Sequence, residues 1–394
     1  MEAAELGHPR AMAKMAGIYM IGEGGVEVNN DKAFDLSKKS ANAGEKLGQY
    51  WLGYCYMNGT GVIKNHFTAL TWFERCKDVY PKANYRMGYI YYFGGHGVEE
   101  DKTKAAQCHS NAADLGHPGA MVCLAGIYMN GEGGVEVNND KAFDLANKSA
   151  NDGDKQGQLW LGNCYDEGIG VLINYVTALT WYARCKDVYP DEANFGMGEI
   201  YYFGGHGVEE DKTKAAQCYS KVADGCGLNN PRAMAFMAEF YIDGTGGVEV
   251  DNGKAFLCAT KSAEARDKYG EFQLARCNQF GIGVRKNYST ALLLYESSKD
   301  DDNDLGVIFK HMGEIYRDGG HGVEQELTKA VDCFRKASDL GTLDEPGSAQ
   351  FCLAGMYYNG VGVEKSVTEA IELHKKSAEQ GYEKAREFLT FNNL

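Results

Sequence analysis

The sequence predicts an all-α protein, an α/α superhelical solenoid of about ten tandem helix–turn–helix repeats. Three observations indicate this fold. Long segments of the chain are near copies of one another, apolar residues recur at helical spacing, and 50 glycines fall at regular intervals between the helical stretches. A short helix pair cannot bury its apolar face alone, so tandem pairs stack on their neighbours.

The internal repetition has two periods. The segment IYMIGEGGVEVNNDKAFDL from Ile18 returns with one change from Ile127, 109 residues later. The segment FGGHGVEEDKTKAAQC starts at Phe93 and again at Phe203, 110 residues later, and a weaker copy starts at Gly319. This threefold super-repeat divides into three smaller units of roughly 36 to 40 residues, a length typical of two-helix repeats.

Each small unit reads as two helices joined by a glycine-rich turn. The segment from Ala120, AMVCLAGIYMNG, places apolar residues at i, i+3, i+4 and i+7, which is one helix face. Gly131 can end that helix because glycine adopts positive φ, and the NND that follows supplies N-cap residues for the second helix. A small residue in the middle of the first helix, such as Gly53, Gly88 or Gly162, indicates close approach of a neighbouring helix.

These units run through the chain without a composition break. We therefore predict one continuous repeat domain over residues 1–394, with a partial capping repeat over residues 378–394.

The charge balance argues against nucleic acid as a ligand. The net charge is −15 and the chain has no basic run, so it repels phosphate backbones. No stretch reaches 18 apolar residues, which excludes membrane insertion as a helix. The N-terminal MEAAELGHPRAMAK lacks the apolar core of a secretory signal, so we expect a cytoplasmic protein.

The repeat resembles the Sel-one-like repeat family, a relative of the tetratricopeptide repeats. The residues that carry the resemblance are LGYCYMNGTGV from Leu52, LGNCYDEGIGV from Leu161 and LAGMYYNGVGV from Leu353. The pattern recurs about ten times along nearly the whole chain. The resemblance implies an α/α superhelix that acts as a scaffold or adaptor in multiprotein assemblies.

When the repeats are aligned with one another, each position of the unit forms a column. Most of the twelve cysteines fall in columns that apolar residues fill in other repeats. Cys55, Cys164 and Cys277 replace isoleucine, and a second set of cysteines shares its column with Leu36, Trp72, Leu145 and Trp181. We interpret them as small core residues. Cys108 with Cys123, and Cys333 with Cys352, lie equidistant from a turn and could pair as disulfides.

These cysteines leave a second function open. The resemblance also extends to a secreted, cysteine-rich bacterial branch, which implies a hydrolase or small-molecule binder as the alternative. A count of disulfides separates the two, since several bridges would favour that branch.

His96, His206 and His321 occupy identical GGHGV turns. Three repeats separate each from the next, about 27 Å at 9 Å per stacked layer, so they cannot share a metal ion. We predict turn residues, no metal site, no cofactor and no enzymatic activity.

Columns that vary between repeats are not needed for packing, and two such columns lie three residues apart on one face of the first helix. In tetratricopeptide-like solenoids the first helices line the concave surface. We therefore predict a groove that binds a peptide or protein segment, rich in aromatic residues and arginine in its first half and acidic in its second. Its candidate residues are Trp51, Tyr54, Arg86, Tyr89, Phe93, Trp160, Asn163, Glu199, Phe236, Glu239, Arg276, His311 and Glu314. The alternative is that the aromatic residues only pack sideways against neighbouring repeats.

Overall fold

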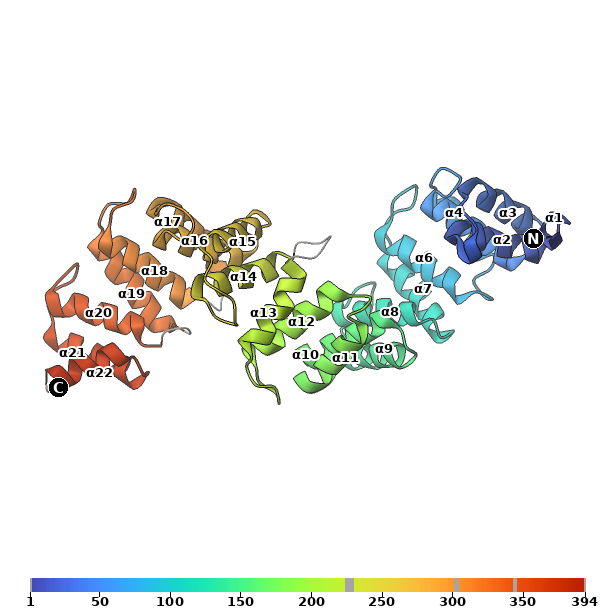
Figure 1. The fold of residues 1–394 in the computed structure, drawn as a ribbon. Coiled ribbons are helices and arrows are strands. Elements are labelled where there is room, and N and C mark those ends of the chain that lie inside the picture. The colour runs from blue at the N-terminus through green and yellow to red at the C-terminus, as the bar shows by residue number, and fades with distance from the viewer. Residues whose placement is uncertain (1, 224–229, 301–304, 343–345, 393–394) are drawn as a thin grey trace. The chain divides into compact units, whose positions relative to one another are not determined.

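The predicted all-α fold is confirmed. The computed structural model describes residues 2–223, 230–300, 305–342 and 346–392. Over these residues the chain forms 22 α-helices and two short 3-10 helices, and extended pairing is limited to three isolated bridges (Figure 1). Most helices are 12 to 14 residues long, as the small repeat requires.

The helices follow one another in ten pairs, with α1 before the first pair and α22 after the last. The first six pairs and α1 are α1 Glu2–Glu5, α2 Pro9–Ile21, α3 Asn30–Asn42, α4 Lys46–Asn58, α5 His66–Glu74, α6 Pro81–Phe93, α7 Lys102–Asp114, α8 Pro118–Asn130, α9 Asn139–Asn151, α10 Lys155–Glu167, α11 Tyr175–Cys185, α12 Pro190–Phe203 and α13 Lys212–Ala223. The remaining helices are α14 Pro231–Asp243, α15 Asn252–Glu264, α16 Lys268–Phe280, α17 Tyr288–Ser297, α18 Leu305–Asp318, α19 Leu327–Leu340, α20 Ser348–Asn359, α21 Val367–Glu379 and α22 Glu383–Phe391. The 3-10 helices are η1 Glu23–Gly25 and η2 Ser298–Asp300.

The chain divides into two compact units. Unit 1 comprises Met1–Gly196 with Gly205–Val208, and unit 2 comprises Met197–Gly204 with Glu209–Leu394, so the division falls within α12. The predicted partial repeat near the C-terminus is a single helix, α22, that begins at Glu383.

The second helix of each pair is tied to the first by the residues that carry the repeat pattern. In α8, Gly131 has φ of 66° and ends the helix, and the Asn138 side chain then caps α9 by accepting a 2.9 Å hydrogen bond from the Lys141 backbone N–H. The backbone N–H of Asn138 donates to the Tyr128 carbonyl at 2.8 Å, and the Lys141 ammonium lies 5.0 Å from the Tyr128 ring centroid. The recurrent tyrosine is thus a structural residue.

Close helix approach at the small residues of the first helices is also confirmed. A Cβ added to Gly53 would come 2.8 Å from the ring of Phe73 on α5, and one added to Gly88 would come 2.6 Å from the ring of His109 on α7. Glycine at these positions therefore makes room for a ring from the second helix.

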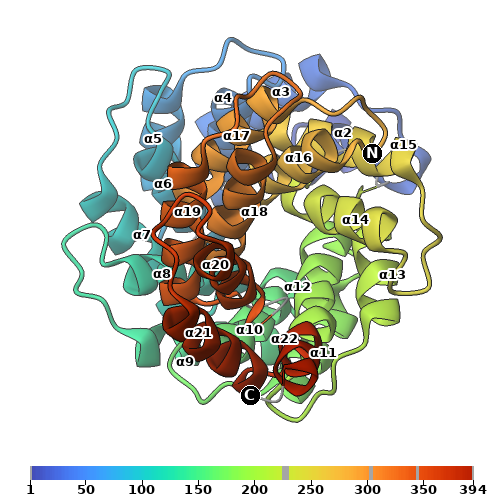
Figure 2. The same cartoon turned by 90° about the vertical axis from the view of Figure 1, so that its left-hand side faces the viewer.

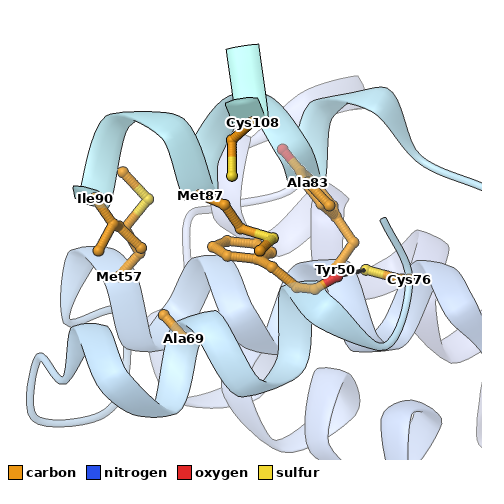
Figure 3. Close-up of a cluster of buried hydrophobic side chains, with 9 residues drawn as sticks. Tyr50, Met57, Ala69, Cys76, Ala83, Met87, Ile90 and Cys108 are labelled. Carbon is orange, nitrogen blue, oxygen red and sulfur yellow. Dashed lines mark hydrogen bonds between the residues drawn. The ribbon is translucent and has the colours of Figure 1, made fainter. Parts of the chain in front are cut away.

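The core of unit 1 lies between successive helix pairs. Figure 3 shows the cluster from α4, α5 and α6, in which Met57 contacts the side chain of Ile90 and Tyr50 lies beside Met87. Phe73 is fully buried at its centre. The expectation that Trp72 fills this packing column is wrong, since Trp72 is only half-buried and Arg75 covers its ring at 4.4 Å.

Some first helices of adjacent repeats pack directly on one another: α2 on α4 and α8 on α10 in unit 1, and α14 on α16 in unit 2. Within unit 1, α7 and α9 lie outside the row formed by α6, α8 and α10 (Figure 2). The variable columns belong to the first helices, so in unit 1 they lie on the row that includes α6, α8 and α10.

The GGHGV histidines are turn residues, as predicted. His96, His206 and His321 have φ of 50°, 47° and 50°, and each lies between the two residues of a Gly–Val bridge. Each imidazole lies 4.8 to 4.9 Å from the ring of the residue that begins the second helix of the preceding repeat, which is histidine or tyrosine. The turns thereby connect neighbouring repeats.

The cysteines mostly follow the prediction that they are small core residues. Cys55, Cys164 and Cys277 are fully buried, as the isoleucine column requires. Cys108 is also buried, and neither it nor the half-buried Cys123 is part of a disulfide in the structure. Cys333 is likewise a free thiol, and Cys226 lies outside the described residues.

Candidate functional site

Three consecutive first helices of unit 1 surround a cleft of about 390 Å³, hereafter the unit 1 cleft. Its lining comes from the C-terminal end of α2, the first residue of α3, α4 and the turn after it, the first turns of α6 and the residue that precedes α8. The lining residues are Met20, Ile21, Asn30, Tyr50, Trp51, Tyr54, Asn58, Thr60, Lys82, Tyr85, Arg86 and His117. Three of the predicted groove residues therefore lie together in one cleft: Trp51, Tyr54 and Arg86.

Trp51 owes its position to a glycine of the preceding repeat. A Cβ added to Gly17 on α2 would lie 2.8 Å from Cζ2 of the indole, so only glycine leaves space for the ring. The indole also meets Tyr50 and Tyr54 edge to face, at 5.1 and 5.8 Å between centroids. The indole therefore packs against α2 and against Tyr50 and Tyr54. Because Trp51 is only half-buried, the rest of its surface lines the cleft.

Arg86 lies between two tyrosine rings. Its guanidinium carbon is 5.4 Å from the Tyr54 centroid and 5.3 Å from the Tyr85 centroid, within the range of cation–π attraction. Burial raises the pKa of Tyr50, and a hydrogen bond from Arg86 opposes that shift. The Arg86 Nε is buried without a hydrogen-bond partner among the described residues, and no carboxylate in this part of the chain forms an ion pair with Arg86.

His117 lines the cleft at the start of α8. His117 is the N-cap residue of α8, and its Nδ1 accepts a hydrogen bond from the Ala120 backbone N–H at 3.2 Å. The imidazole stacks on Tyr85, with centroids 4.6 Å apart. Burial lowers the pKa of His117, and the positive charges of Lys82 and Arg86 lower it further.

The remaining predicted residues of unit 1 lie outside this lining. Tyr89 and Phe93 continue along α6 with their rings 4.6 Å apart, and both are largely exposed, at 43% and 62%. Trp160 repeats the arrangement of Trp51, because a Cβ added to Gly126 would lie 3.2 Å from its ring. Asn163 accepts a 2.9 Å hydrogen bond from the hydroxyl of Tyr182.

In unit 2 the predicted charged residues Glu239 and Arg276 have partners within the chain. Glu239 accepts hydrogen bonds from the hydroxyls of Tyr202 and Tyr269 at 2.6 and 2.5 Å, and burial raises its pKa. Arg276 pairs with Asp243 at 2.9 Å.

Two further predicted residues of unit 2, His311 and Glu314, contact each other. Glu314 accepts from Gln279 and contacts Nδ1 of the buried His311, both at 3.1 Å. Glu199 is half-buried on α12.

Phe236 requires a correction. The residue is only 2% exposed and stacks on Tyr219 with centroids 4.6 Å apart and planes 4° apart. It belongs to the core of unit 2, because the rings of Tyr202, Tyr219 and Tyr269 surround it, with centroids 4.6 to 5.1 Å from its own. Phe236 is therefore not available to a groove ligand in this structure.

Sequence reasoning missed several residues of the unit 1 cleft, among them Lys82, Tyr85 and His117. Lys82 lies four residues before Arg86 on the same helix face, which was a usable signal. His117 comes from the turn before α8, and no column of the first helices includes it.

These stacked helix pairs, with variable side chains gathered on the first helices, define a tetratricopeptide-like α/α repeat protein. The chain belongs to the Sel1 repeat family: the family model, described as Sel1 repeat, matches residues 9–45, 46–75, 81–117, 119–154, 155–184, 191–225, 231–267, 268–303, 311–342 and 347–382. This confirms the resemblance noted in the sequence.

Curated relatives share part of the chain. Chitin synthase regulatory factor 2 of Schizosaccharomyces pombe is 29% identical over 226 residues, which cover 55% of this chain and 44% of that protein. Cytochrome c oxidase assembly factor 7A of Xenopus laevis is 25% identical over 151 residues, covering 36% of this chain and 64% of the relative. The chain thus spans less than half the length of the first of these relatives.

A solved structure shows the same fold. A protective antigen of uropathogenic Escherichia coli, described as displaying an SLR fold, matches with a TM-score of 0.66 and 24% identity, over 100% of this chain and 90% of the antigen. None of the helices in the described ranges is both long and apolar enough to cross a membrane.

Proposed function

We propose that this protein is a protein-interaction scaffold, and that the unit 1 cleft binds a peptide segment of a partner protein. The observation that carries the proposal is the set Trp51, Tyr54 and Arg86, which converges on one cleft from two successive first helices. Other repeats place glycine or cysteine in the same columns, so these large side chains are not required by the repeat itself. Tryptophan, tyrosine and arginine are the residues that dominate binding hot spots.

The relatives support an adaptor or regulatory role in which the chain binds and does not catalyse. The name of the fission-yeast relative describes a regulatory factor of an enzyme, and that of the frog relative an assembly factor. Free thiols such as Cys108 and Cys123 fit a reducing compartment, so we propose that the protein acts in the cytoplasm.

Selection from a displayed library of random 12-residue peptides on the full-length chain tests this function. Peptides that are enriched over a matrix control should bind the wild-type protein in solution. Trp51→Ala should weaken their binding by about 2 kcal/mol or more, as truncation of a hot-spot residue does.

Trp72→Ala is the matched control. Trp72 is also a half-buried tryptophan, but it lies on α5 outside the cleft, so its truncation should leave peptide binding unchanged. Failure to enrich any peptide, or equal binding by wild type and Trp51→Ala, would rule out the proposed function.

A further inference from the structure

The charged groups of the unit 1 cleft all have the same sign. Lys82 and Arg86 line it, and His117 can add a third positive charge on protonation. Among the described residues that form the lining, none is an aspartate or a glutamate. This is unusual on a chain with a net charge of −15.

One carboxylate outside the lining, Asp154, acts on residues of the cleft through its charge. Asp154, whose charge acts on both Tyr85 and His117, caps α10 by accepting from the Gly157 backbone N–H at 2.8 Å. It also accepts from the Ser149 hydroxyl at 3.3 Å. Asp154 therefore lies outside the lining and is held by α10, although its negative charge still acts on His117.

Arg276 is an arginine of this chain whose charge is balanced by an ion pair. Arg276 on α16, a first helix of unit 2, forms a 2.9 Å ion pair with Asp243 and a 3.0 Å hydrogen bond with Gln273. Arg86 has aromatic rings on its two sides and a buried Nε without a partner in the described part of the chain. Arg86 thus places in the cleft a charge that no carboxylate of the described residues pairs with, and a carboxylate of a ligand can supply that pair.

We propose that the unit 1 cleft recognises an acidic peptide segment, in which carboxylate side chains meet Arg86 and Lys82 while a neighbouring apolar side chain packs against Trp51 and Met20. This inference rests on the proposed function and names the chemistry of its partner. Arg86 offers guanidinium donors to a carboxylate, and the two flanking tyrosine rings hold the guanidinium in place. His117 adds a donor, because Nδ1 accepts from Ala120 and the proton of the neutral ring is then on Nε2.

A peptide suits this site better than a nucleic acid. The cleft holds about 390 Å³, enough for a few side chains, and the sequence has no basic run that would extend its charge. A longer polyanion would place its further phosphates on a chain whose net charge is −15 and would be repelled by it. A peptide segment with two or three carboxylates places its charges in the cleft and avoids that repulsion.

The peptides selected above provide the first test. They should be enriched in aspartate and glutamate next to an apolar residue. Capped copies, acetylated and amidated, in which asparagine and glutamine replace the acidic residues should bind at least about tenfold more weakly. The capped ends show that the carboxylates of side chains, and not a chain terminus, are recognised.

Variants of the protein provide the second test. Arg86→Gln should weaken binding of the acidic peptide about tenfold, and Lys82→Gln, an exposed position that cannot disturb the core, about threefold. Lys148→Gln makes the same charge change on the exposed face of α9 and should have no effect. The loss caused by Arg86→Gln should disappear for the neutral peptide copy.

The outcomes separate this inference from the proposed function. Selected peptides that are neutral or basic, or acidic peptides that bind Arg86→Gln as well as wild type, would overturn the acidic ligand while leaving the cleft a peptide site. A 12-nucleotide single strand of DNA that displaces the peptide at lower concentration than the peptide itself would also overturn it. If no peptide is selected at all, the proposed function fails as well.

Discussion

The ring of Tyr182 on α11 lies directly over Gly162 on α10: a Cβ added to Gly162 would come 2.7 Å from Cε1 of the tyrosine. Tyr182 is only 2% exposed. The same ring also lies against Gly196 of the next repeat, where an added Cβ would come 2.8 Å from Cζ of the tyrosine. Two glycines on successive first helices thus make room for one ring from the helix between them.

Gly162→Ala should therefore destabilise unit 1, although alanine is the better helix former. The extra methyl group meets a ring that is closed in by Gly196 and cannot move away, and overpacking of this kind costs about 1–3 kcal/mol. Denaturant unfolding of the variant and wild type measures the difference. Gly355→Ala is the control, because a Cβ there meets nothing within 4 Å, and it should be neutral or stabilise by up to about 1 kcal/mol. Equal effects of the two substitutions would contradict the close packing.

Phe73→Ala and Trp72→Ala should differ sharply despite being adjacent. Phe73 is fully buried in the cluster that includes Tyr50 and Met87, so its truncation should cost about 3–5 kcal/mol. Trp72 is half-buried beneath Arg75, and its loss should cost about 1–2 kcal/mol, since much of its surface already contacts water. Parallel thermal melts decide the order, and a greater loss for Trp72→Ala would show that the assignment of the core is wrong.

Asp166 should make the stability of unit 1 depend on pH. Burial raises the pKa of Asp166 from 3.8 to about 6, against the effect of a 2.9 Å hydrogen bond from the Tyr182 hydroxyl. The folded state therefore holds the proton more tightly than the unfolded state. The contribution of Asp166 is most favourable below pH 4 and is lost as the pH rises through about 6.

Asp166→Asn, which cannot ionise, should accordingly be more stable than wild type at neutral pH by on the order of 1 kcal/mol. The advantage should shrink steadily as urea unfolding is repeated at lower pH, and should be absent near pH 4. A difference that does not change with pH would mean that the carboxyl group ionises in the folded protein as it does in water.

The thiols should be reduced and slow to react. Burial raises the pKa of Cys55, Cys164 and Cys277 to about 12, so almost no thiolate is present near pH 8. Native protein should react slowly with a disulfide reagent such as Ellman's, and protein denatured without reductant should expose close to twelve thiols. Recovery of half that number or fewer would favour the cysteine-rich, disulfide-bonded alternative.

The helical repeat could be predicted because its signals are local and occur about ten times. The glycine after each first helix, the Asn or Asp cap and the recurrent tyrosine act within a few residues of one another, as Gly131, Asn138 and Tyr128 do. Comparison of the repeats with one another then distinguished the positions that hold one residue type, which serve packing, from the positions that vary. Trp72 shows where this comparison failed, because a column can be apolar in most repeats and still face partly outward.

The candidate site was only partly visible in the sequence, since a varying column contains residues with different surroundings. Trp51 and Phe236 share a column, yet Trp51 lines a cleft while Phe236 is stacked on Tyr219 in the core. The difference comes from the second helices, whose side chains decide how much space remains above each first helix.

What the sequence determined by itself is the class of fold, its number of repeats and the helix face on which variation gathers, because helical periodicity and capping are short-range properties. Only the tertiary structure decided which charges are neutralised. Arg276 meets Asp243, 33 residues earlier in the chain, at 2.9 Å, whereas Arg86 lies between Tyr54 and Tyr85 and meets no carboxylate among the described residues. Such pairing depends on distances between side chains of different repeats, and these are set by how each helix packs on the next.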